Sequence, residues 1–153
     1  MTRIHFIADV FAEQHLGGGE LSNQELIKLL GKKDKEVIQC LSAQVTPDYI
    51  LENRGDKFIV GNFLGLSEDS KKCLMDNCSY IIYEHDHKYL ISRDPSVYEN
   101  YQAPDSDIIN KDFYESSVAV ICQSKLHRDV VKQNLKLDNI ISVGGNLWDD
   151  HTL

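Results

Sequence analysis

Four titratable side chains stand in a row where an apolar run ends: Glu84, His85, Asp86 and His87. Histidine can share or accept a proton near neutral pH, and it can donate a hydrogen bond to a sugar hydroxyl or a phosphate. If strand geometry continues, His85 and His87 point to the same side, and this spacing could also hold a metal ion with Asp86 as a further ligand. The alternative is a solvated strand end with helix-capping chemistry. We favour a binding or catalytic site because of its position after a strand.

A glycine-rich turn, Gly17-Gly18-Gly19-Glu20, precedes the first helical pattern. Glycines let the backbone approach a ligand closely, and the free N–H groups at a helix start favour a phosphate. The turn is neither a GxGxxG fingerprint nor a P-loop, because no Gly-Lys-Ser/Thr follows. The alternative is a flexible turn in which Glu20 stabilises the helix start.

Two further groups of polar residues could bind an anion. Ser124 and Lys125 follow the fifth predicted strand, with Arg128 one turn on, and a capped helix start with nearby cations can hold an anion. Ordinary capping by Ser124 is the alternative. Lys88 and Arg93 are the lysine and arginine of the long polar stretch 85–104, where they could bind an acidic acceptor or balance its carboxylates.

Strand-like and helical patterns alternate along the chain. Strands are predicted over 4–8, 36–41, 57–61, 79–84, 117–122 and 139–143, and helices over 20–30, 47–51, 67–75, 105–114 and 124–135. This order predicts an α/β fold: a single Rossmann-like domain over 1–153, with a doubly wound, mainly parallel sheet and helices on both faces. Ligands bind outside the carboxyl ends of such strands, which selects the loops 9–20, 84–104 and 123–125.

Composition narrows the function classes. A net charge of -8 on 153 residues argues against general nucleic-acid binding, because an acidic domain repels a phosphate backbone. The four cysteines form no CxxC pair; Cys40 and Cys122 lie in apolar runs and are interpreted as core thiols of a reducing compartment. No signal peptide and no apolar run of about 20 residues is present, so we expect a cytoplasmic protein without a transmembrane segment.

Taken in order, these segments resemble the N-terminal half of retaining GT-B glycosyltransferases, especially family 4. The resemblance covers nearly the whole chain and is carried by the glycine turn after the first strand, by Tyr83-Glu84-His85-Asp86-His87, by 118–127, and by 139–146 with Trp148-Asp149. That family has two Rossmann-like domains. The N-terminal domain mainly binds the acceptor, whereas the C-terminal domain binds the nucleotide-sugar donor and carries paired glutamates.

The resemblance implies roles for the candidate residues. The backbone of Gly17, Gly18 and Gly19 would approach the donor pyrophosphate, and Glu20 would begin the helix behind that loop. His85 or His87 would lie near the donor sugar and the acceptor hydroxyl and act catalytically. Ser124 and Lys125 would line the floor of the cleft; the candidate substrate-binding residues are Glu84, Asp86 and Arg93.

The family's second domain has no counterpart in this sequence. The resemblance therefore implies the acceptor-side domain of an enzyme that transfers a sugar from a nucleotide-sugar donor to a glycan or other acceptor, without a cofactor or metal. We expect it to need a donor-binding domain or partner chain, because groups from both sides stabilise the transition state. The alternatives are a metal-dependent hydrolase built on His85, Asp86 and His87, and a non-catalytic α/β binding module.

Overall fold

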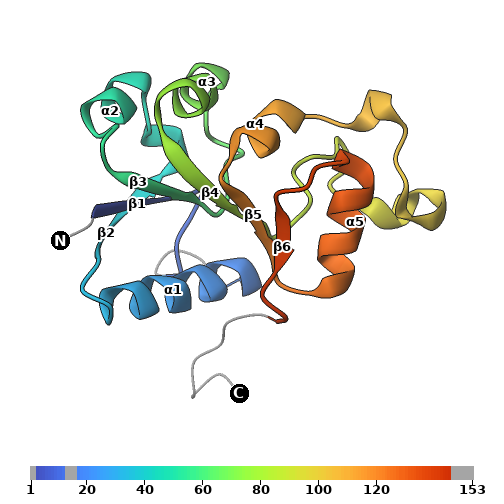
Figure 1. Cartoon of the computed structure of the whole chain (residues 1–153), viewed down its shortest axis with the longest axis horizontal. Helices are drawn as coiled ribbons and strands as arrows, with labels where there is room; N and C mark the ends of the chain where they lie inside the picture. The colour runs from blue at the N-terminus through green and yellow to red at the C-terminus, as the bar shows by residue number, and fades with distance from the viewer. Residues whose placement is uncertain (1–2, 13–16, 146–153) are drawn as a thin grey trace.

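The computed structural model describes residues 3–12 and 17–145, which form one six-stranded, all-parallel sheet (Figure 1). The strand order is β2-β1-β3-β4-β5-β6. The strands are β1 Arg3–Ala8, β2 Glu36–Leu41, β3 Lys57–Val60, β4 Ser79–Tyr83, β5 Ala119–Cys122 and β6 Ile140–Ser142. The predicted Rossmann-like, parallel α/β fold is confirmed.

The helices lie unevenly on the two faces of the sheet. They are α1 Gly18–Gly31, α2 Pro47–Glu52, α3 Glu68–Asn77, α4 Lys111–Ser116 and α5 Lys125–Leu135. Right-handed crossovers place the helix of the β1-to-β2 connection on one face and the later helices on the other, because the chain reverses its direction across the sheet after β2. Figure 1 shows α1 below the sheet and α2, α3 and α4 above it.

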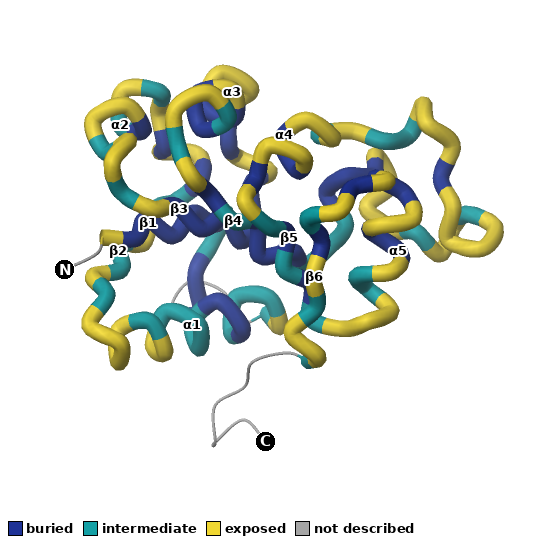
Figure 2. Tube along the Cα trace, in the orientation of Figure 1, coloured by how far each residue is buried: buried dark blue, intermediate teal, exposed yellow. Residues whose placement is uncertain are grey.

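The two faces have separate cores. The larger core packs residues of α3, α4 and α5 against strand residues such as Phe58, Ile82 and Val120. The smaller core packs α1 against Phe6, Ile59 and Tyr83. In Figure 2 the central strands are mostly buried, whereas the edge strands β2 and β6 are partly exposed.

The predicted helix over 105–114 is wrong. The structure has a 3-10 turn, Asp105–Asp107, followed by α4. Asn110 separates the two with a left-handed backbone, φ 58°. Its Nδ2 donates to the carbonyl oxygen of Lys88 (3.0 Å) and its Oδ1 accepts from Lys71 Nζ (3.0 Å). These tertiary hydrogen bonds hold a conformation that ends a helical pattern.

Candidate functional site

The glycine turn and the histidine-bearing loop meet at the carboxyl ends of the strands. Gly17 caps α1 in an extended conformation, and α1 begins at Gly18. A Cβ atom at Gly19 would lie 3.4 Å from the ring Cγ of His85 and 3.6 Å from its Cδ2, which is close van der Waals contact, so a side chain longer than a methyl group would meet the ring. The backbone of α1 therefore packs directly on the imidazole of His85, and a side chain at Gly19 would push the two loops apart.

His85 is held as a neutral ring between two amides. Its Nε2 lies 2.7 Å from Oδ1 of Asn23, and its Nδ1 lies 2.5 Å from Nε2 of Gln123. The Asn23 oxygen can only accept and the Gln123 amide donates, so the proton belongs on Nε2. Burial lowers the pKa of His85 to about 4. This ring is fixed and uncharged at neutral pH, with both nitrogens already engaged.

His87 does not continue the strand. β4 ends at Tyr83, and His87 has a left-handed φ of 55°, so the interpretation that His85 and His87 share one side of a continuing strand is wrong. The Nδ1 of His87 is 2.8 Å from the hydroxyl of Tyr89, and its ring centroid lies 4.4 Å from that of His127. Burial lowers the pKa of His87 as well.

His127 is the residue that sequence reasoning missed. Together with His87 it lines a pocket of about 240 Å³, whose other lining residues are Pro95, Tyr101, Ser124, Leu126 and Val130. Its Nε2 is buried and has no hydrogen-bond partner among the described residues. Burial and the neighbouring histidines lower its pKa to about 4. His127 lies three residues after the Ser124 cap, in the first turn of α5, and this spacing is the sequence signal that could have placed it next to the histidine loop.

Glu84 lies beneath the loop and not on its outer surface. The side chain is buried, and its carboxylate accepts hydrogen bonds from the Tyr114 hydroxyl (2.5 Å) and from the His87 backbone N–H (2.6 Å). Burial raises its pKa. In this geometry Glu84 anchors the histidine loop from below, where a substrate in the pocket does not reach it.

Asp86 holds two cations of the same loop. Its carboxylate pairs with Nζ of Lys88 and lies 3.5 Å from Nη1 of Arg93. Lys88 is buried and also donates to Oδ1 of Asn62 (2.7 Å). The side chains of Asp86 and Arg93 are both about half exposed, so these two predicted substrate-binding groups remain accessible.

Ser124 caps α5, as predicted. Its Oγ accepts the backbone N–H of His127 (3.0 Å), and both Ser124 and Lys125 are exposed. The cap therefore fixes the position of one imidazole of the pocket.

Replacing Ser124 with alanine is expected to lower the free energy of unfolding by about 1 kcal/mol, because the His127 N–H loses its acceptor. Urea denaturation at pH 7 measures the change. The equivalent cap of α3, in which Ser67 Oγ accepts the Ser70 N–H (3.1 Å), offers the matched variant Ser67→Ala. An unchanged free energy of unfolding in both variants contradicts this account.

The carboxylate of Asp9 is used within the fold. It accepts hydrogen bonds from the Ser42 hydroxyl and from the backbone N–H groups of Leu64 (3.1 Å) and Gly65 (2.9 Å), so it ties together the loops after β1, β2 and β3. Within residues 3–12 and 17–145, no three His, Cys, Asp or Glu side chains converge in a way that could hold a metal ion. The hydrolase alternative therefore finds no ligand set in this part of the chain.

Comparisons with protein-family models, with curated proteins and with solved structures found no match. Asn146 and Trp148-Asp149, part of the resemblance to GT-B glycosyltransferases, lie outside the described residues. In the part of the chain that the structure describes, no helix is long and apolar enough to cross a membrane.

Proposed function

We propose that this chain is the acceptor-side domain of a retaining GT-B-type glycosyltransferase, which transfers a sugar from a nucleotide-sugar donor to a glycan or other acceptor. The observation that supports it most is the contact between Gly19 and His85, which brings the start of α1 against the loop after β4. The crevice outside the carboxyl ends of parallel strands is where such folds bind ligands.

The chemistry of the pocket suits a sugar. His87 and His127 are neutral rings at physiological pH because burial lowers the pKa of each, and a neutral imidazole can both donate to and accept from hydroxyl groups. The exposed ring of Tyr101 on the pocket wall offers an apolar face to a saccharide. Arg93, which belongs to the same loop, adds a positive charge for an acidic acceptor or a phosphate.

Backbone resonances of the ¹⁵N-labelled chain provide the test. We expect a nucleotide sugar to shift the amides of 17–20 and a matching saccharide to shift those of His87 and His127, with Kd values of about 1 mM, because half of a cleft supplies only part of the contacts. The panel covers UDP-, GDP- and ADP-sugars and a set of oligosaccharides.

Two glycine variants serve as a matched pair. Gly19→Val places a side chain against His85 and is expected to weaken binding about tenfold or more, a loss of about 1.4 kcal/mol. Gly55→Ala is the control, because an added Cβ meets open space there, far from the glycine turn. Two results overturn the proposal. Either no resonance shifts with any ligand at 10 to 20 times the expected Kd of about 1 mM, or the shifts fall on amides other than those of 17–20, His87 and His127.

A further inference from the structure

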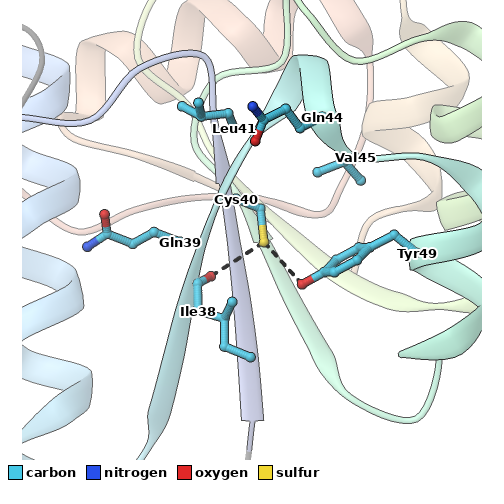
Figure 3. Close-up of a pocket in the computed structure, with 7 residues that line it drawn as sticks. All are labelled: Ile38, Gln39, Cys40, Leu41, Gln44, Val45 and Tyr49. Atoms are coloured by element: carbon cyan, nitrogen blue, oxygen red, sulfur yellow. Dashed lines mark hydrogen bonds between the residues drawn. The ribbon is translucent and has the colours of Figure 1, made fainter.

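A second pocket lies on the outer strand of the sheet, apart from the histidine loop. It has a volume of about 230 Å³ and is lined by Ile38, Gln39, Cys40, Leu41, Gln44, Val45 and Tyr49 (Figure 3). β2 is the edge strand, so this side of the sheet is only partly covered, and the Cys40 side chain is half-buried. Figure 3 shows the thiol and the Tyr49 hydroxyl pointing toward each other.

Four side chains form a continuous hydrogen-bonded row behind this pocket. Sγ of Cys40 lies 3.3 Å from the Tyr49 hydroxyl, and that hydroxyl lies 2.6 Å from Nδ1 of His5. Nε2 of His5 lies 2.8 Å from Oδ2 of Asp56. The thiol can also donate to the carbonyl oxygen of Ile38, at 3.6 Å.

The chemistry of the four groups decides which one donates and which one accepts in each hydrogen bond. Arg3 Nη1 lies 4.0 Å from the Asp56 carboxylate, and a carboxylate only accepts hydrogen bonds, so Nε2 of His5 carries the proton of this pair. Nδ1 is then the accepting nitrogen, so Tyr49 donates to it and the Tyr49 oxygen is left to accept the thiol proton. His5 is 1 % exposed and stacked on Phe58, with ring centroids 4.9 Å apart, so this base receives protons through Tyr49 and not from bulk water.

We propose that Cys40 is a nucleophilic thiol that transfers its proton through Tyr49 to the His5–Asp56 pair, and that its pocket takes a small uncharged acyl group from a thioester. A nucleophile within reach of a base that a third group orients is the arrangement of covalent catalysis. The aliphatic walls of Ile38 and Val45 suit a short acyl chain, and about 230 Å³ leaves no room for a large one.

The transfer balances without an oxidant. The Cys40 sulfur attacks the thioester carbonyl carbon while its proton passes to the Tyr49 oxygen and the Tyr49 proton passes to Nδ1 of His5. The bond from the carbonyl carbon to the incoming sulfur replaces the bond to the leaving sulfur. The leaving thiolate then takes the proton back from His5 through Tyr49, so Cys40 ends as a thioester. Burial raises the pKa of the Cys40 thiol, so the resting sulfur is protonated and depends on this transfer.

The test measures acetylation of each cysteine by S-acetyl-N-acetylcysteamine at pH 7, followed by peptide mass spectrometry. Cys78 is the internal control, because it is also half-buried, burial raises its pKa to about 11, and no histidine lies within hydrogen-bond distance of its sulfur among the described residues. We expect Cys40 to react at least about 100-fold faster than Cys78, which is the low end of general-base assistance. Tyr49→Phe and Asp56→Asn are each expected to slow Cys40 about 100-fold, toward the rate of Cys78, and to leave Cys78 unchanged.

The direction in which the acetylation rate of Cys40 changes distinguishes this proposal from a hydrogen-bond network with a purely structural role. If the hydrogen bonds only hold α2 on the sheet, Tyr49→Phe loosens the pocket and acetylation of Cys40 becomes faster. Cys40 and Cys78 reacting at equal rates, or an unchanged or faster rate at Cys40 in both variants, overturns the proposal. The melting temperature of each variant is measured alongside, and Asp56→Asn, whose side chain is partly exposed and keeps its shape, remains informative if Tyr49→Phe unfolds.

Discussion

Acidification from pH 7 to pH 4 is expected to lower the free energy of unfolding by at least about 3 kcal/mol, through the histidines of the candidate site. The pKa of His85 is about 4 in the folded chain and near 6.5 in an unfolded one. Between these values the unfolded chain binds the extra proton. The stability that depends on a neutral His85 is therefore fully present above pH 6.5 and is lost as the pH falls through 4.

Two neighbours modify this loss in opposite directions. His127, whose pKa is also about 4, adds to the loss, but part of its shift comes from charges on His85 and His87, so the contributions are not additive. Glu84 acts the other way. Burial raises its pKa, so the folded chain takes up a proton first and gains stability as the pH falls.

Guanidinium denaturation at about pH 7, 6, 5 and 4 measures the effect, because this range spans the unfolded histidine pKa near 6.5 and reaches the folded value of about 4 for His85. The variant His85→Gln is expected to be less stable at pH 7 and to lose less stability on acidification, because one titrating group is gone. Equal free energies of unfolding for the native chain at the two ends of this pH range contradict the assignment of buried neutral rings.

The sequence predicts what depends on neighbouring residues along the chain. β2 was predicted over its exact range because 36–41 is a continuous apolar-rich run, and the Ser124 cap was predicted because an N-cap acts on an N–H group three residues on. The parallel direction of the strands was predicted from the alternation of strands and helices. The meeting of the glycine turn with His85 followed from the rule that ligand loops share one edge of a parallel sheet.

What the sequence does not predict depends on partners far away in the chain. The left-handed backbone of Asn110 is held by hydrogen bonds to Lys88 and Lys71, which are more than 20 residues away, and no local pattern shows it. Cys40 was interpreted as a core thiol because its run is apolar, but the strand order makes β2 an edge. A central strand and an edge strand can have the same apolar sequence pattern. The burial of Cys40 can therefore be predicted only when the strand order is known.

Replacing Asp86 with alanine is expected to lower the free energy of unfolding by about 2–3 kcal/mol, because it leaves the buried ammonium of Lys88 without its closest negative charge. The value is below the about 3–5 kcal/mol that breaking a fully buried pair costs, since Asp86 is half exposed. Urea denaturation at pH 7 measures it. Asp129→Ala is the control: Asp129 pairs with Arg128 on the surface at 2.9 Å, and its removal is expected to cost less than about 1 kcal/mol.

A double variant separates the ion pair from loop strain. If the cost of Asp86→Ala comes from the unpaired charge of Lys88, then Lys88→Met in the same chain restores part of the lost stability, because an uncharged side chain of similar length can fill the site over Phe63. Lys88 also lowers the pKa of Glu84, so Glu84 takes up a proton more readily in the double variant and leaves no second unpaired charge. Strictly additive losses instead show that Asp86 supports the backbone of the loop. In that case the stability that Asp86 contributes does not arise from neutralising Lys88, and the accessible pair of Asp86 with Arg93 keeps its charge for the acceptor contact that we propose.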